Sequence, residues 1–151
     1  MSLHLHFFSP PEFNRAGVNW FQRMDAAILV RLDILRFRLN ARVMISPVDG
    51  ATGRHEGAEN KSQHNVDYHG MVRAVDFFAP GVSASRVVNA MRSLGFTGIG
   101  VYPDGVYGGE QETRYHGDAR TDRGPGNPAE WGHYDGKNCS INEALQRVVK
   151  L

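Results

Sequence analysis

The most regular pattern of apolar and polar positions lies between residues 18 and 39. There the apolar side chains recur three or four residues apart, and arginines and aspartates fill many of the positions between them. This period is that of a helix with one buried face, and we therefore predict a core helix over residues 18–39. The apolar positions are Met24, Ile28, Leu32, Leu35 and Leu39.

Serine followed three residues later by glutamate is the pattern of a capping box, which marks the start of a helix. It occurs at Ser9–Glu12, where we predict a short helix, and again at Ser140–Glu143, where we predict the final helix. A further helix is expected after Ser83 or Ser85, with Gly95 just beyond its end. The apolar side of the final helix consists of Ile141, Leu145, Val148 and Val149.

Strands are predicted from shorter apolar runs bounded by turn residues. Residues 48–60 contain three glycines, several charges and few apolar side chains, which is typical of a surface loop, and residues 121–128 form a second such loop. Helices and strands mix without the rhythm of repeated βαβ units, so we predict one α+β domain over residues 1–151, with a small antiparallel sheet flanked by helices. The predicted strands are 42–46, 71–78, 96–102 and 110–117.

Composition narrows the classes of function. The net charge is +1 with histidine neutral, so no strong electrostatic field points to nucleic acid or an anionic membrane as a partner. The single cysteine, Cys139, excludes an internal disulfide and a cysteine-rich zinc site. We find no secretory signal at the N-terminus and no apolar span near twenty residues. We therefore expect cytoplasmic synthesis, no membrane insertion and a monomer.

Candidate metal ligands are concentrated in the stretch Ser62–Phe78, which contains two histidines and two aspartates. Imidazole nitrogen and carboxylate oxygen are favoured donors for Zn²⁺, and a catalytic zinc keeps three protein ligands and one open position. His64 or His69 would serve with Asp76, and His116 is the best candidate for the third ligand. Polar loop residues with no ligand would also account for the pattern.

A longer series of residues helps to decide between a zinc site and polar loop residues without a ligand. It consists of Ser62, His64, Arg73–Asp76, His116, Asp118, Arg120 and Trp131. In this order and context the series resembles the M15 family of zinc peptidases. That family includes D-alanyl-D-alanine carboxypeptidases, vancomycin-resistance dipeptidases and phage endolysins, and the hedgehog signalling domain shares its fold. The resemblance covers most of the chain and implies a hedgehog/D-Ala-D-Ala peptidase-like fold with Zn²⁺ as cofactor.

The resemblance also implies roles for individual residues. The metal-binding aspartate of the family falls on Asp76 and its second histidine on His116. The first histidine has two candidates, because the Ser-x-His context selects His64 whereas the family's spacing to the aspartate selects His69. We favour His64, which requires five extra residues in the intervening loop.

The general base departs from the family pattern. Relatives place a glutamate or aspartate three residues before the second histidine, where this chain has Thr113. Glu112 and Glu110 have even offsets from His116 and would share its face of a strand, so we expect Glu112, or else Glu110, to act as the base. Asp118 is on that face too, either as a base or as a hydrogen-bond partner that orients His116.

The resemblance also implies which residues contact the substrate. The family's substrate-contacting arginine has no counterpart in Ser46–Asp49, and Arg54 or Arg120 is expected to replace it, with Trp131 as the aromatic contact. The function implied is a zinc-dependent peptidase that cleaves bacterial peptidoglycan peptides, of endolysin or carboxypeptidase type, after release to the wall by another factor. The alternatives are a non-catalytic zinc-binding module of the same fold, such as a virion or cell-wall binding protein, and an unrelated α+β binding domain without metal.

Overall fold

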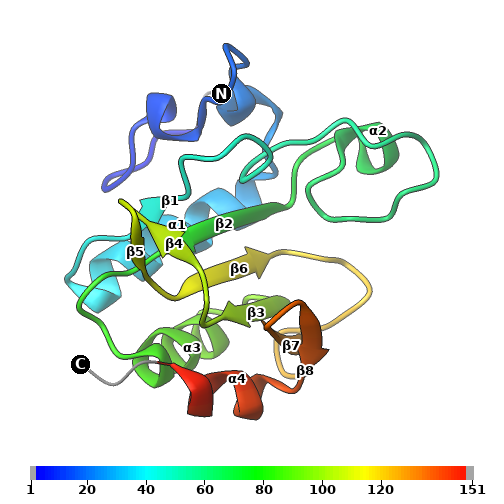
Figure 1. Cartoon of the computed structure of the whole chain (residues 1–151). Helices are drawn as coiled ribbons and strands as arrows, with labels where there is room; N and C mark the ends of the chain where they lie inside the picture. Colours follow the sequence, from blue (N-terminus) through cyan, green and yellow to red (C-terminus); the bar gives the residue numbers. More distant parts are fainter. Residues whose placement is uncertain (1–2, 149–151) are drawn as a thin grey trace.

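The computed structural model describes residues 3–148 and has one six-stranded sheet with helices packed on one face (Figure 1). Short 3₁₀ helices at Pro10–Phe13 and Trp20–Arg23 precede the first α-helix. The α-helices are α1 (Ala26–Leu39), α2 (Val66–His69), α3 (Ala84–Ser93) and α4 (Ile141–Arg147). The strands are β1 (Met44–Ile45), β2 (Ala74–Phe78), β3 (Gly98–Tyr102), β4 (Val106–Tyr107), β5 (Glu110–Gln111), β6 (Arg114–Asp118), β7 (Ala129–Tyr134) and β8 (Lys137–Cys139).

The sheet has the strand order β1-β2-β6-β3-β7-β8, and β4 and β5 form a separate two-stranded ribbon. All neighbours in the six-stranded sheet are antiparallel except β3 and β7, which are parallel. The predicted α+β class is confirmed, but the prediction of a purely antiparallel sheet is wrong. Alternation along a strand shows which face is buried and contains no information on the direction of the neighbouring strand.

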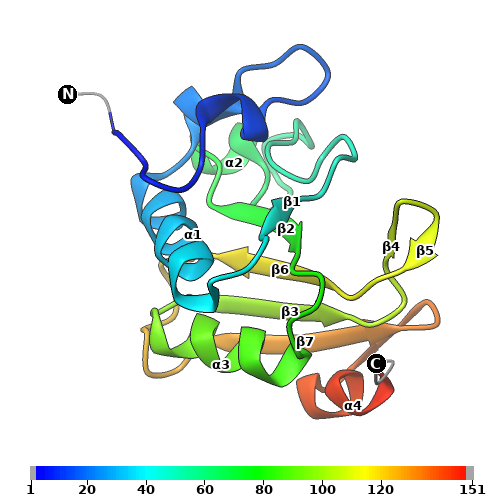
Figure 2. The same ribbon diagram turned by 90° about the vertical axis from the view of Figure 1, so that its left-hand side faces the viewer.

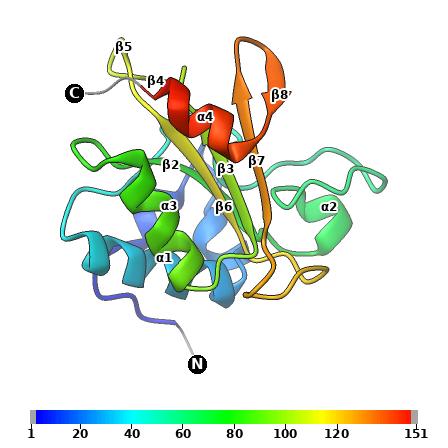
Figure 3. The same cartoon turned by 90° about the horizontal axis from the view of Figure 1, so that it is seen from below.

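The two faces of the sheet have different roles. Odd-numbered residues of β2, β3 and β6 point into the core, where α1 and α3 cover them, and α4 packs on β7 and β3 (Figures 2 and 3). The even-numbered residues of these strands lie on the opposite face, and they include Asp76, His116 and Asp118 of the candidate site. The core residues of this group are Val75, Phe77, Ile99, Val101 and Tyr115.

Helix α1 begins eight residues later than the apolar period indicates. Asp25 is its N-cap, and the Asp25 carboxylate accepts a hydrogen bond of 2.9 Å from the Ala27 amide. A side chain that accepts hydrogen bonds from the first free amides marks the N-terminus of a helix. The helix therefore begins after Asp25, and the preceding apolar residues form the 3₁₀ helix Trp20–Arg23 instead. The predicted start at residue 18 is therefore wrong.

The other predicted helix starts agree with the structure. Ser83 and Ser140 are N-caps whose side chains accept hydrogen bonds from the amides of Arg86 and Glu143. The box at Ser9–Glu12 opens only a 3₁₀ helix. Val149, assigned to the apolar side of the final helix, lies outside the described residues.

Several segments differ from their predictions. The strand expected over 110–117 is divided into β5 and β6, and the hairpin β7–β8 was not predicted at all. Its turn is Asp135-Gly136, where both residues have positive φ (52° and 72°), as a two-residue hairpin turn requires. In the predicted surface loop 48–60, Ala51–Gly53 is buried. Within the described chain, no helix is both long and apolar enough to cross a membrane.

Candidate metal centre

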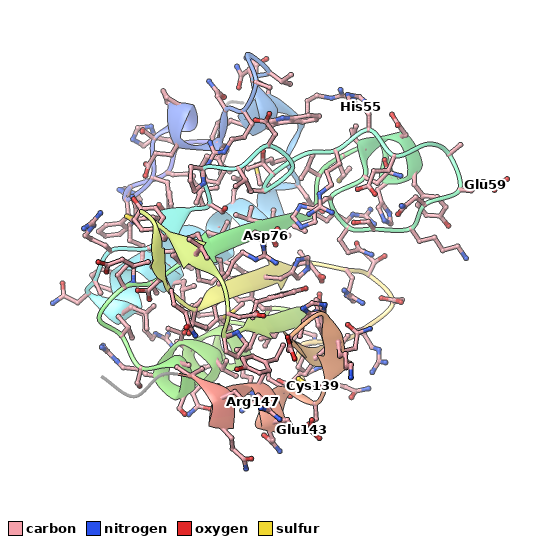
Figure 4. All side chains as sticks on the ribbon, viewed as in Figure 1. His55, Glu59, Asp76, Cys139, Glu143 and Arg147 are labelled. Carbon is pink, nitrogen blue, oxygen red and sulfur yellow. The ribbon has the colours of Figure 1, made fainter. Side chains whose placement is uncertain are left out.

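Three side chains from separate segments meet on the polar face of the sheet. Asp76 lies in β2 and His116 in β6, and the two are directly opposite each other in the antiparallel register. His64 reaches the same point from the segment that precedes α2. Figure 4 labels Asp76, which is on β2 between the α2 segment and β6. Each of the three side chains is at least nine-tenths buried.

The three ligand atoms form a nearly equilateral triangle. His64 Nε2 lies 3.3 Å from Asp76 Oδ1 and 3.3 Å from His116 Nδ1, and His116 Nδ1 lies 3.2 Å from Asp76 Oδ1. Zinc bonds of about 2.0–2.1 Å at tetrahedral angles place neighbouring ligand atoms about 3.3–3.4 Å apart. The triangle therefore has the size that a zinc ion with three protein ligands and one open position requires.

A backbone carbonyl orients His64. Its Nδ1 lies 2.6 Å from the carbonyl oxygen of Thr52, which can only accept, so Nδ1 carries the proton and Nε2 offers a lone pair to the centre. Thr52 is itself buried and its hydroxyl donates to the carbonyl of Phe13. Ala51–Gly53, the buried part of the loop 48–60, thus fixes His64 in the tautomer that a metal ligand needs.

A carboxylate orients His116 in the same way. His116 Nε2 lies 2.8 Å from Asp118 Oδ2, and Arg120 donates to both oxygens of Asp118, at 2.9 Å from Nε and 2.6 Å from Nη2. Asp118 has no exposed surface. A Cβ at Gly98, directly opposite Asp118 on β3, would overlap the Asp118 carboxylate, so a glycine is required there.

Burial and hydrogen bonding shift the pKa values of the three candidate ligands in opposite directions. Burial raises the pKa of Asp76, but the hydrogen bond donated by His116 and the closeness of the two imidazole rings outweigh it and hold that pKa well below its usual range. Burial lowers the pKa of His64, which has one carboxylate neighbour. Burial also opposes charge on His116, but its hydrogen bonds to Asp118 and Asp76 raise its pKa to about 9. Without a metal, the extra proton of His116 therefore lies on Nδ1, toward Asp76.

The structure separates the two candidates for the first histidine. His69 is the last residue of α2, where its Nε2 lies 3.1 Å from the Lys61 carbonyl oxygen and its Nδ1 lies 3.4 Å from Arg73 Nη1. Among the described residues, the group that brings three potential ligand atoms together contains His64 and not His69. The short helix α2, which was not predicted, turns His69 away from the centre.

The centre opens into a cleft of about 400 Å³. Arg54, Arg120 and Trp131, the expected substrate contacts, all line it. Arg54 Nη2 lies 3.4 Å from Asp76 Oδ2, and the Trp131 indole packs against the His116 ring with centroids 4.9 Å apart. Ser62, the serine of the Ser-x-His context, lines the cleft as well. The remaining lining residues, which the sequence analysis did not single out, are Lys61, Gln63, Tyr102 and Arg114.

The expected general bases lie elsewhere. Glu110 is exposed on β5, and Glu112 is partly buried, which raises its pKa. Neither lines the cleft. Glu112 precedes His116 by four residues, a separation of about 13 Å along an extended chain. Asp118 is fully engaged by His116 and Arg120, so it occupies the orienting position that we considered for it.

Comparisons of the chain with protein-family models, with curated proteins and with solved structures found no match. The site is therefore defined by its own geometry. Two imidazoles of fixed tautomer and one carboxylate converge at the buried end of an open cleft. This donor set and this spacing fit a zinc ion, and the resemblance to the zinc peptidases stays a prediction.

Proposed function

We propose that the chain is a zinc-dependent peptidase that hydrolyses peptide bonds of bacterial peptidoglycan, with a hedgehog/D-Ala-D-Ala peptidase-like fold. The observation that carries the proposal is the triangle of ligand atoms with edges of 3.2–3.3 Å at the end of a cleft. His64, Asp76 and His116 would hold the ion. The resemblance of the sequence to zinc peptidases supports the choice of substrate.

Zinc with an open coordination position supplies Lewis-acid activation of a water molecule and of the scissile carbonyl. The protein contributes the orientation of the two histidine ligands. The Thr52 carbonyl and the Asp118 carboxylate aim the two imidazoles, and Arg120 neutralises the buried charge of Asp118. Trp131 covers one side of His116 and limits the access of solvent to it. In this proposal the chain acts on the wall after another factor releases it.

One observation favours a second candidate function, a zinc-binding module of the same fold that binds the wall without cutting it. Asp76 is the sole carboxylate among the described residues that line the cleft, and it is a metal ligand. A general base must come within hydrogen-bond reach of the proton that it removes. A peptidase would therefore need Glu112, or else Glu110, to move toward the centre, whereas a binding module would not.

Metal analysis together with a wall-digestion assay tests the proposal. Purified protein, never exposed to chelator, should contain about one zinc per chain and release soluble peptides from purified peptidoglycan. Asp76→Ala should lose both properties, because it removes one of three ligands. His69→Ala is the matched control for His64→Ala and should retain the zinc that His64→Ala loses.

The two candidate functions then separate by outcome. Zinc-loaded protein that binds peptidoglycan without cleaving it would establish the binding module and reject the peptidase. Protein that contains no transition metal, and gains no thermal stability from added zinc, would reject both.

A further inference from the structure

The cleft beside the metal centre is strongly cationic, and its arginines differ in what they contact. Arg54 lies within ion-pair distance of Asp76 and Glu56, and Arg120 is bonded to Asp118 through two nitrogens. The charges of these two arginines are therefore already balanced by carboxylates of the protein. Lys61 is exposed, and a solvated ammonium on a flexible chain is a weak anchor.

Arg114 is the exception. Within residues 3–148 its guanidinium forms no hydrogen bond or ion pair, and its Nε is buried without a partner. The guanidinium is nevertheless held in place, 4.4 Å above the ring of Tyr102, and the Tyr102 hydroxyl accepts a 3.0 Å hydrogen bond from Trp131 Nε1. Arg114 is thus a positioned cation whose donors are unused.

A second unpaired polar atom belongs to another residue that lines the cleft. Gln63 Oε1 is buried and accepts no hydrogen bond from a described residue. Buried polar atoms without partners are rare in folded proteins and each one needs an explanation. A peptide that carries a carboxylate offers an acceptor to the guanidinium of Arg114.

We propose that Arg114 binds a carboxylate of the substrate, so that the cleft selects acidic peptides over neutral ones. This inference rests on the proposed function and specifies its substrate class. A guanidinium can bind a carboxylate through two parallel hydrogen bonds, which a lysine cannot do. Tyr102 and Trp131 act as positioning residues that hold the guanidinium.

The register of the sheet limits where that carboxylate lies in the substrate. Arg114 and His116 are two residues apart on the same face of β6, which separates their Cα atoms by about 6.6–6.8 Å. An extended peptide advances by about 3.3 Å per residue. The carboxylate therefore belongs to a residue within one or two positions of the scissile bond, either at the C-terminus or on a side chain.

Peptide binding, measured before turnover, tests this assignment. Stopped-flow tryptophan fluorescence of the zinc-loaded protein is suited to it, because Trp131 lines the cleft and Trp20 gives a constant background. The probes are N-acetyl-D-alanyl-D-alanine, its C-terminal amide, and that amide with D-glutamate in place of the first alanine. The wild type should bind at least one of the two acidic probes about 10–100-fold more tightly than the neutral amide. Which acidic probe binds more tightly distinguishes a terminal from a side-chain carboxylate.

Arg114→Gln should reduce that preference to twofold or less. Lys61→Gln is the matched control: it removes one charge from the same cleft and should leave most of the preference, because an exposed charge is screened. Arg114→Lys keeps the charge without the paired donors and should give an intermediate preference. It also serves as the test variant if Arg114→Gln does not fold, since an unchanged preference in Arg114→Lys would then reject the assignment.

Equal affinity of the wild type for all three probes, or no binding of any, would overturn the inference. So would a preference that survives in Arg114→Gln or disappears equally in Lys61→Gln. These outcomes are independent of hydrolysis: a zinc-loaded protein that leaves peptidoglycan intact contradicts the proposed peptidase, while its preference for acidic probes can still be measured.

Discussion

At the residue scale, the two imidazoles of the centre are oriented by partners of different kinds. A backbone carbonyl, that of Thr52, holds His64, whereas the side chain of Asp118 holds His116. The contact to Asp118 is charge-assisted and also raises the basicity of His116 as a ligand. Substitution can remove the second contact without touching the first, so the contribution of each can be separated.

Asp118→Asn should weaken zinc binding by about 10–100-fold while the chain stays folded. The amide oxygen of asparagine can still accept from His116 Nε2, but the negative charge is lost and Arg120 loses its ion pair. Competition with a chelator measures the affinity. Asp122→Asn, a nearby exposed carboxylate, should change it by less than twofold, and unchanged affinity in Asp118→Asn would show that the contact does not support the metal.

Zinc affinity should increase with pH. In the metal-free protein the pKa of His116 is about 9, above its usual value, so the imidazole keeps a proton up to that pH and zinc must displace it. One proton released per zinc bound means that the apparent Kd falls about tenfold per pH unit from pH 7 to 9 and then levels off. Chelator competition at several pH values tests this, and a Kd that is constant between pH 7 and 9 would contradict it.

At the element scale, the glycines of β3 make the polar face of the sheet possible. Gly98 and Gly100 lie opposite Asp118 and His116 of β6, and on the other side Gly100 lies beside Trp131 of β7. A Cβ at Gly100 would approach the indole of Trp131 to 2.7 Å. The strand therefore leaves space for large polar and aromatic side chains where ordinary residues would fill it.

Gly98→Ala should lower the free energy of unfolding by about 1–3 kcal/mol and weaken zinc binding, because the new methyl group displaces the Asp118 carboxylate. Chemical denaturation and zinc competition measure the two effects. Gly124→Ala is the matched control: nothing lies within 4 Å of its added Cβ, and its stability should change by no more than about 0.5 kcal/mol. Equal effects in the two variants would contradict the steric argument.

The sequence indicated the ligand set better than the elements that assemble it. Asp76 and His116 could be proposed because the resemblance to the zinc peptidases points to them and both are residue types that bind zinc. The choice between His64 and His69 depends on the four-residue helix α2, which has no clear apolar period. The Asp135-Gly136 dipeptide is a hairpin signal that the sequence does contain. The parallel pairing of β3 and β7 is a tertiary fact that local patterns do not contain.

At the scale of the whole molecule, a metal at this site would connect parts of the chain that are far apart in sequence. His64 and His116 are separated by 52 residues, and Asp76 and His116 by 40. The unfolded chain does not hold these ligands together, so the free energy of zinc binding adds to the free energy of folding. The protein should therefore be markedly more stable with zinc than without it.

Free zinc at about 100 times its Kd should stabilise the protein by about 2.7 kcal/mol. For a chain of this length that raises Tm by about 5–10 °C. Scanning calorimetry with and without a chelator tests the expectation, and Asp76→Ala should show no zinc-dependent shift. A wild-type Tm that does not respond to zinc would indicate that the three side chains form only a hydrogen-bonded cluster.

The directly opposed pair Asp76 and His116 has a kinetic consequence. A slip of one residue between β2 and β6 would turn one of the two ligands into the apolar core, so the centre exists only after the strands have found their native register. If pairing in that register follows the rate-limiting step, zinc leaves the rate of refolding unchanged and slows unfolding. The ion would then provide kinetic stability: it would extend the lifetime of the native state without accelerating folding.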